Sequence, residues 1–353
     1  PLLRCEDPLA RRLEHDLYHN FINLTEFDDD KVVPDYFPVE WQTYFHPFGF
    51  EISETHATDS QGNSVGFQYN HVIEDLGDAY PTLKPSKFGV LREESLAYRQ
   101  AAEEAFGDIL PVQMAMKCLV AVPTQQVVHM MGMENMFYAM YDYPDEFKGM
   151  MNRLADDYLA FFHMLETEGY LLPTTSFQTL CQGSLCFTDE LPDKTPLTTH
   201  DVWGFMDSQE SVGLSPEMYH EFVFPCYRRI AEAYGLLSYG CCEPVHPIWD
   251  DVKTLHNLRK VSISPWCNEE IMGERLRGQR VIYQRKPSPN FLGVGKTLDE
   301  EAVREHITTT LKAAQGCKLE ITQRDVYTIA NDVDKVRRYV AIIRDLIDKL
   351  WQG

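Results

Sequence analysis

The fold is decided by residues 202–240, which read VWGFMDSQESVGLSPEMYHEFVFPCYRRIAEAYGLLSYG. The short apolar run at 202–206 predicts a buried strand. The Ser-Pro pair at 215–216 predicts a helix start, because serine caps the first turn and proline is tolerated within it. Gly235 is typical of a helix end. The run at 236–240 then predicts a second strand, so this stretch predicts a complete strand–helix–strand unit.

The same alternation continues to the end of the chain. Further strands are predicted at 258–264, 280–284 and 318–322, and helices at 245–256, 269–276, 297–316 and 332–350. The helix starting at Thr297 carries a capping-box pattern, with Glu300 three residues later. Strands joined through helices lie parallel in one sheet. No glycine-rich phosphate loop follows any of these strands, so the pattern favours an α/β fold of the (β/α)8 TIM-barrel type over a doubly wound sheet.

The region before this alternation is less regular. Residues 1–105 are expected to form an irregular N-terminal cap, packed on a barrel body of residues 106–353 within one structural domain. Inside the cap, residues 13–27 predict a helix, and the turn signal at 59–63 before an alternating run predicts a hairpin. The body is predicted to begin with a strand at 109–116.

A long helical stretch is predicted after that first strand, and Pro144 is expected to open a second helix that ends near Gly169. Apolar residues recur in the second helix at helical spacing: Phe147, Met150, Met151, Leu154, Tyr158, Phe161 and Phe162. A stripe of this kind is far more often core than a binding site, so we assign it to packing.

The composition limits the classes of function. The 353 residues contain 32 Lys and Arg against 54 Asp and Glu, a net charge of −22. A nucleic-acid binder needs a cationic surface, so nucleic acid is not an expected partner. No apolar run approaches the roughly 20 residues of a membrane helix and no signal peptide is evident, so no membrane association and a cytoplasmic location are expected. The chain begins at Pro1, which leaves a trimmed targeting segment open. The nine cysteines are irregularly spaced, which indicates reduced thiols.

Polar or thiol-bearing residues follow the five predicted strands from 202 onward. They are Met206–Glu210, Tyr239–Pro244 with His246 behind it, Ser264–Cys267, Gln284–Pro287 and Thr322–Asp325. Because the carboxyl ends of parallel strands meet on one face of a barrel, we expect these residues to converge into an active site. A salt-bridge layer among the charged residues is the alternative.

The most informative of these stretches is Cys241-Cys242-Glu243. Thiolate and carboxylate ligands suit zinc, which predicts a metal site at Cys242 with Glu210 as a further ligand. Neighbouring residues on a strand face opposite sides, so only one of the two thiols is expected to point inward. Two alternatives stay open: both thiols are small buried hydrophobic groups, or one of them is a nucleophile. Cys317 precedes its strand and is not expected at the site.

Four of these segments resemble the uroporphyrinogen decarboxylase superfamily, specifically the decarboxylase-like branch found beside corrinoid-dependent methyltransferases. They are SQESVGLSP (208–216), YGCCEP (239–244), SISPW (262–266) and RKPSP (285–289). The resemblance covers roughly residues 105–350 and extends only loosely into the first hundred residues. It implies a TIM barrel that is commonly a homodimer.

The chain departs from the motifs of that superfamily in two ways. The arginine-rich motif that holds the carboxylates of uroporphyrinogen is missing, because residues 11–12 lack its surroundings. The methyltransferase members bind zinc through a His-x-Cys and a late Cys. Here Gly240 stands two residues before Cys242, and Arg-Asp at 324–325 occupies the late position. A zinc site would therefore recruit carboxylates beside Cys242.

The resemblance implies an O-demethylase type of methyltransferase. It would pass the methyl group of a small methylated compound, expected to be a methoxylated aromatic, to cob(I)alamin on a partner corrinoid protein. A zinc ion would polarise the ether oxygen, or a carboxylic acid would protonate it. The expected catalytic acids are Glu210, Glu243 and Asp325, and the expected substrate-binding residues are Gln209, Trp266, Arg285 and Lys286. The alternatives are a cofactor-free decarboxylase and a catalytically silent barrel used for binding.

Overall fold

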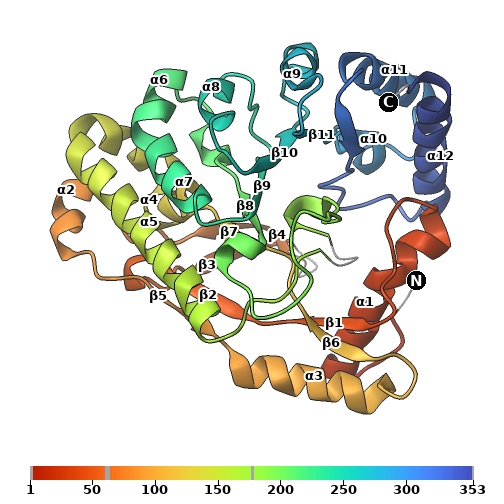
Figure 1. Ribbon diagram of the computed structural model, residues 1–353, viewed down its shortest axis with the longest axis horizontal. Coiled ribbons are helices and arrows are strands. Elements are labelled where there is room, and N and C mark those ends of the chain that lie inside the picture. The colour runs from red at the N-terminus through yellow and green to blue at the C-terminus, as the bar shows by residue number, and fades with distance from the viewer. Residues whose placement is uncertain (1–2, 60–63, 176–178, 352–353) are drawn as a thin grey trace.

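The computed structural model describes residues 3–59, 64–175 and 179–351. Its centre is a parallel sheet of six strands, and their order across the sheet is their order along the chain (Figure 1). The strands are β7 (Leu119–Ala121), β8 (Trp203–Met206), β9 (Leu236–Tyr239), β10 (Leu258–Ile263), β11 (Ile282–Arg285) and β12 (Lys318–Ile321). The last five confirm the predicted strand–helix alternation, with boundaries that differ from the predicted ones by at most two residues.

Each new strand is added on the same side of the one before it. A doubly wound sheet reverses this direction at its switch point, whereas a barrel keeps adding strands in one direction. The strand order therefore supports an α/β fold of barrel type. β7 and β12 are the edges of the sheet, and no ladder between them is recorded within the described ranges. An eight-stranded closed barrel therefore stays a prediction.

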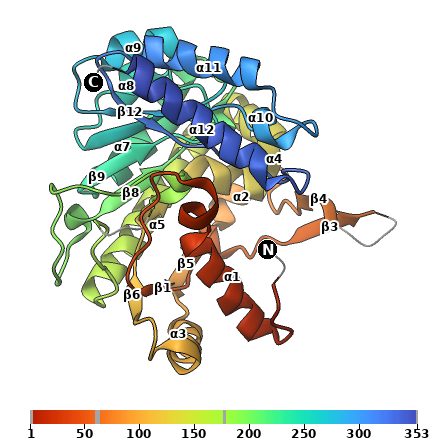
Figure 2. The same ribbon diagram turned by 90° about the vertical axis from the view of Figure 1, so that its right-hand side faces the viewer.

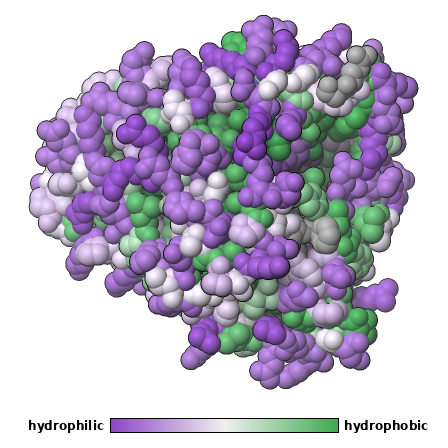
Figure 3. Space-filling view, in the orientation of Figure 1, coloured by the Kyte–Doolittle hydropathy of each residue, from purple (hydrophilic) through white to green (hydrophobic). Residues whose placement is uncertain are grey.

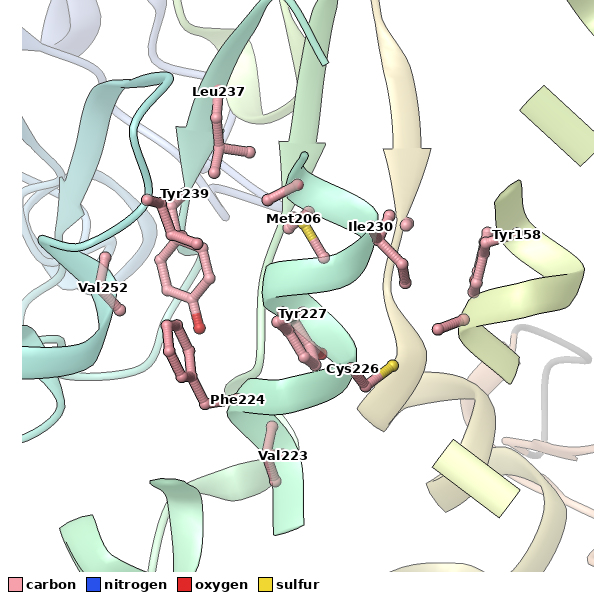
Figure 4. Packing of buried hydrophobic residues seen from close by; sticks show 14 of the residues in the cluster. Tyr158, Met206, Val223, Phe224, Cys226, Tyr227, Ile230, Leu237, Tyr239 and Val252 are labelled. Atoms are coloured by element: carbon pink, nitrogen blue, oxygen red, sulfur yellow. The ribbon is translucent and has the colours of Figure 1, made fainter. Parts of the chain in front are cut away.

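Helices connect the strands and pack on the outer face of the sheet. They are α4 (Pro123–Asp142), α5 (Pro144–Thr167), α6 (Pro216–Met218), α7 (Phe224–Ala231), α8 (Trp249–Val252), α9 (Glu269–Leu276), α10 (Asn290–Gly293), α11 (Glu300–Ala313) and α12 (Val333–Leu350). In Figure 4, Met206 and Tyr239 lie between their strands and α7. The predicted stripe on α5 is buried along its whole length, which confirms its assignment to the core.

Along each strand, every second side chain points to the inner face of the sheet, away from the helices. This inner face is partly polar. Val261 of β10 belongs to the apolar cluster under the helices. Its neighbour Lys260 faces the other way and forms a buried ion pair with Glu320 of β12 (Nζ–Oε2 2.7 Å). The loop at 179–185 packs on this face, where the Lys260 ammonium also donates to the Ser184 hydroxyl (2.8 Å). The inner face is therefore filled by side chains and a loop.

Of two predicted elements near the start of the body, one was wrong and the other is confirmed in part. Residues 119–121, predicted as helical, form the edge strand β7, because three residues are too few to show a period. The strand predicted at 109–116 is the shorter β6 (Val112–Ala115). It pairs in parallel with β1 (Phe37–Glu40) and not with the central sheet.

Two helix starts also differ from prediction. The helix predicted at 245–256 is reduced to α8, because Pro247 cannot donate a backbone hydrogen bond and disfavours helical geometry before it. The cap of α11 is Asp299, whose carboxylate accepts a hydrogen bond from the Ala302 amide (3.1 Å), so the capping box at Thr297 was wrong. The serine cap at Ser215 is confirmed by its bond from the Met218 amide.

The N-terminal residues form a smaller layer beside the sheet. Its elements besides β1 and β6 are α1 (Pro8–Ile22), the π-helix η1 (Asn23–Phe27), β2 (Thr43–His46), β3 (Glu54–Thr58), β4 (Ser64–Tyr69), α2 (Leu76–Ala79), β5 (Lys87–Val90) and α3 (Arg92–Phe106). The predicted helix and the strands of the predicted hairpin are confirmed, while the turn residues 60–63 lie outside the described residues. The β3–β4 hairpin projects from the body (Figure 2). An ion pair between Glu26 and Arg337 joins η1 to α12.

The surface is dominated by polar side chains. Figure 3 shows them over most of one face, with smaller hydrophobic patches between them. This agrees with the net charge of −22. In the part of the chain that the structure describes, no helix has the length and apolar character needed to cross a membrane.

Candidate active site

A cavity of about 650 Å³ opens at the carboxyl ends of the central strands. It is lined by Val128, Met133, Gln209, Glu210, Val212, Cys242, Glu243, Pro244 and Trp266. The predicted site residues brought together here are Gln209, Glu210, Cys242, Glu243 and Trp266. Trp266 is 75% exposed, so its ring stands at the opening of the cavity. A smaller cavity of about 160 Å³ lies at the opposite ends of the strands, beside Arg259 and Lys318.

Glu210 lies in the short helix η6 (Gln209–Ser211), directly after β8. Its side chain lines the cavity, although only 8% of the residue is exposed. The carboxyl oxygen Oε2 is 2.8 Å from the hydroxyl of Thr124, in the first turn of α4. Burial raises the pKa of Glu210 above its ordinary value. The acid form of this carboxyl group therefore persists to a higher pH than that of an exposed glutamate.

A chain of three close contacts runs from Glu210 into the core. The Thr124 hydroxyl is 2.8 Å from the Tyr227 hydroxyl, which donates to the carbonyl oxygen of Asp207 (2.6 Å). Two hydroxyl groups supply only two protons for the three contacts. If Glu210 is ionised, the contact between the two hydroxyl oxygens has no proton. If Glu210 is protonated, all three contacts are hydrogen bonds, which agrees with the raised pKa of its carboxyl group.

Glu243 is a fixed acceptor between two strand ends. Its Oε1 accepts from the Ser208 amide after β8 (2.8 Å), and its Oε2 accepts from the Cys241 amide after β9 (2.8 Å). Only 2% of the residue is exposed. Both oxygens are therefore held by the backbone, which favours a positioning role over the predicted role of proton donor.

The two adjacent cysteines are divided as expected from strand parity. Cys242 lines the cavity, and Cys241 is buried beneath it with its thiol donating to Oε1 of Gln182 (3.1 Å). The sulfurs are 3.5 Å apart, and this contact with Cys241 lowers the pKa of Cys242. The Cys242 thiol also lies 3.9 Å from a carboxylate oxygen of Asp325 in the loop after β12. The second and the last of the five predicted strand ends therefore meet, with Asp325 beside the cavity rather than in its lining.

Lys286 and Asp207 form a second, deeper polar layer. The Lys286 ammonium is buried and donates to the carbonyl oxygens of Gly240 (3.3 Å) and Cys241 (3.2 Å), and burial lowers its pKa. Asp207 is the inward residue at the end of β8, and its Oδ1 is buried with no hydrogen-bond partner in the described structure. Burial, followed by the charges of Glu243 and Glu210, raises the pKa of Asp207 well above its ordinary value. Neither residue lines the cavity, but both lie close to its lining residues Cys242 and Glu243.

Arg285 is not brought to the cavity. Its side chain points from the end of β11 to the outer face of the sheet, where the guanidinium pairs with Glu269 of α9 (2.8 Å). It also donates to the carbonyl oxygens of Ile263 (2.9 Å) and Ser264 (2.7 Å). Its side chain contacts His306 of α11, whose pKa falls to about 4 through burial and this neighbouring charge. Arg285 therefore joins the sheet to its helices in this structure.

The residues present do not fit the predicted zinc ion. Cys242 and Glu210 both line the cavity. Among the described residues, however, no three His, Cys, Asp or Glu side chains converge closely enough to hold a metal. Both oxygens of Glu243 are already used by backbone amides. Zinc remains a prediction that metal analysis of the purified protein would test, and no step below depends on it.

Three residues that contribute to the candidate active site were not singled out from the sequence. Side chains alternate between the two faces of a strand, and by this alternation Asp207 at the end of β8 points to the inner face. The alternation alone would have placed it on the same face as Lys286. Thr124 stands at the helix start after an unrecognised strand, 86 residues before its partner Glu210. Tyr227 lies on the buried face of α7 and looks like an ordinary core aromatic. The sequence carries no signal for these last two contacts.

No known family model matches the chain, and neither does any curated protein. Among solved structures, the fold is similar to that of a methyltransferase from Methanosarcina mazei, with a TM-score of 0.53 and 12% sequence identity. That match covers 96% of this chain and 86% of the other. A B12-independent methionine synthase from Shewanella sp. W3-18-1, in complex with selenomethionine, matches with a TM-score of 0.28 and 12% identity over 85% of this chain and 75% of the other. At this identity, the first likeness supports the barrel-type fold alone.

Proposed function

We propose that this protein is a methyltransferase that moves a methyl group from a small methoxylated aromatic compound to cob(I)alamin carried by a partner corrinoid protein. The observation that carries the proposal is Glu210, a carboxyl group with a raised pKa that faces a mostly apolar cavity. An aryl methyl ether needs apolar walls for its ring and a proton for its departing oxygen. The six-stranded sheet would then be the larger part of a TIM barrel.

The reaction asks this chain to bind, to orient and to donate one proton. Val212, Pro244 and Trp266 line the cavity and offer apolar contacts to the ring. The bond between the methyl carbon and the ether oxygen breaks, and its electron pair stays on the oxygen. The Glu210 carboxyl group gives its proton to that oxygen, so a neutral phenol leaves. The methyl acceptor supplies the electron pair for the new carbon–cobalt bond.

The neighbouring groups hold this acid in place. Thr124 and Tyr227 fix the Glu210 carboxyl group through the chain of contacts described above. Glu243 fixes the two backbone segments that carry Glu210 and Cys242. These contacts fix the position of the carboxyl group, which is a main source of catalytic advantage. The proton on the oxygen that faces Thr124 must pass to the side of the carboxyl group that faces the cavity before it reaches the ether oxygen.

A direct test incubates the purified protein with chemically reduced cob(I)alamin and a panel of methoxybenzoates and methoxyphenols. We expect methylcobalamin, followed by its absorbance, and free phenol in equal amounts. Glu210→Gln is expected to slow this reaction by about a hundredfold, since it removes one general acid. An absence of methylcobalamin with every methoxylated donor would overturn the proposal. Release of carbon dioxide from aromatic or tetrapyrrole acids would instead support the decarboxylase.

A further inference from the structure

A pair of thiols lies below the cavity, beside the inner face of the sheet. The sulfurs of Cys118 and Cys181 are 3.6 Å apart, although the residues are separated by 63 positions in the chain. Cys118 directly precedes β7, and Cys181 begins the turn η4 (Cys181–Gly183). A disulfide holds its sulfurs about 2.05 Å apart, so this pair needs to close by roughly 1.5 Å. Both residues are partly buried.

The two thiols differ in their chemistry. The hydrogen bond from Cys118, helped by the nearby charge of Lys117, lowers the pKa of Cys181. The same bond and burial raise the pKa of Cys118 well above its ordinary value. The thiolate is the reactive form of cysteine, so Cys181 is the attacking group and Cys118 is the neighbour that completes the bond.

We propose that Cys118 and Cys181 form an oxidisable dithiol, which a peroxide converts into an intramolecular disulfide. The Cys181 thiolate attacks one oxygen of hydrogen peroxide, the O–O bond breaks, and the products are a sulfenic acid and hydroxide. The Cys118 thiol then attacks that sulfur, and water leaves. In total, two thiols lose two electrons and two protons, and one peroxide becomes two waters. A reduced thiol such as dithiothreitol reverses the bond by exchange.

The disulfide would act on a loop that contacts both edges of the central sheet. Residues 179–185 contact β12 through the Leu185 amide, which donates to Glu320 (3.0 Å). They also contact the chain beside β7 through Cys181. Gln182, in the same loop, accepts the Cys241 thiol beneath the cavity. Oxidation would therefore tie the loop, at a position one residue from Gln182 and its contact with Cys241, covalently to the residue before β7. This inference does not rest on the proposed methyl transfer.

A competing pair of sulfurs lies in the same protein. Cys241 and Cys242 are 3.5 Å apart, so close contact alone does not choose between the two pairs. Tryptic peptides separate them. Cleavage leaves Cys118 alone in the peptide 118–148 and both vicinal cysteines in the peptide 230–253. The peptide 154–194 holds Cys181 together with the buried Cys186, which fragmentation of that peptide resolves.

The test treats the folded full chain with a small excess of hydrogen peroxide, blocks the remaining thiols and maps the tryptic peptides without reduction. We expect two thiols fewer per chain and a linked pair of peptides 118–148 and 154–194 joined through Cys181. Dithiothreitol should restore both thiols. The wild-type map decides the question even where a variant fails to fold.

Serine variants test whether Cys118 and Cys181 form the linked pair. Cys118→Ser and Cys181→Ser should each abolish the linked pair. The matched control Cys5→Ser changes a partly buried thiol near the N-terminus and should keep it. A bond confined to the peptide 230–253, a bond to Cys186, or retention of all nine thiols in the reduced form would overturn the proposal.

Discussion

At the scale of single residues, two buried glutamates a few residues from adjacent strands have opposite environments. Glu243 receives two backbone N–H donors, one on each oxygen. Glu210 contacts a chain of two hydroxyl groups, which have two protons for three contacts. All three contacts are hydrogen bonds only when the Glu210 carboxyl group supplies the third proton. The environments separate a fixed acceptor from a proton donor, which is how one site assigns different work to similar side chains.

The pH dependence of methyl transfer tests the assignment of Glu210. Its acid form is the proton donor, and burial raises its pKa above the ordinary value of 4.5. The acid form therefore persists to higher pH than in an exposed glutamate, and kcat is expected to fall as the pH rises through that raised pKa. Glu210→Gln should remove this limb of the profile, while the exposed Glu104→Gln should keep it. A profile of unchanged shape in Glu210→Gln would contradict the assignment.

Glu243 clamps two backbone segments together, because its two oxygens accept from the Ser208 and Cys241 amides. This clamp is expected to have a measurable effect on stability. Glu243→Gln keeps one oxygen acceptor but turns an NH2 group toward the second backbone donor. We expect a loss of about 1–3 kcal/mol in the free energy of unfolding, because a buried amide is left without an acceptor. Urea denaturation measures it. Glu103→Gln, which breaks only the exposed pair with Arg99, should cost at most about 1 kcal/mol. Equal stability of the two variants would argue against the clamp.

At the scale of elements, the ends of α11 and α12 show how local side chains set helix boundaries. Asp299 and Asp332 each accept a hydrogen bond from the backbone amide three residues later. Such a cap satisfies one of the free N–H groups of the first turn. The carboxylate also faces the positive end of the helix dipole.

The corrected cap of α11 leads to a paired substitution. Asp299→Ala removes the bond to the Ala302 amide and should lower the free energy of unfolding by about 1 kcal/mol. Thr297→Ala should change it by less than about 0.5 kcal/mol, because Thr297 is exposed and lies outside the helix. Both values come from the same urea titration. A larger loss in Thr297→Ala than in Asp299→Ala would restore the capping box expected from the sequence.

Much of the second half of the fold follows from local chemistry. Strands β8 to β12 were predictable because each is a short apolar run set between recognisable helix signals. β7 was not, since a three-residue strand beside a long helix leaves no periodicity to read. The outward direction of Arg285 and the inward direction of Lys286 follow from strand parity once the strand is known. The contact of Glu210 with Thr124 depends on how distant segments pack, which no local pattern encodes.

At the scale of the whole molecule, the polar inner face of the sheet must be satisfied by groups from several segments. Lys260 and Glu320 come from strands β10 and β12, and loop residues Ser184 and Leu185 complete their hydrogen bonds. A charge at such a depth is tolerated only with a full set of partners. The ion pair therefore couples the far edge of the sheet to the loop at 179–185.

Removing one member of this pair should be costly, and removing both should be less so. Lys260→Met leaves the Glu320 carboxylate buried without its cation, and we expect a loss of about 3–5 kcal/mol in the free energy of unfolding. In Lys260→Met/Glu320→Leu no unpaired charge remains, so part of that loss should be recovered. Lys253→Met, which breaks an exposed pair with Asp250, should cost less than about 1 kcal/mol. If the double variant were no more stable than Lys260→Met, the buried charge would not be what makes the single substitution costly, and the loop contacts themselves would hold the inner face together.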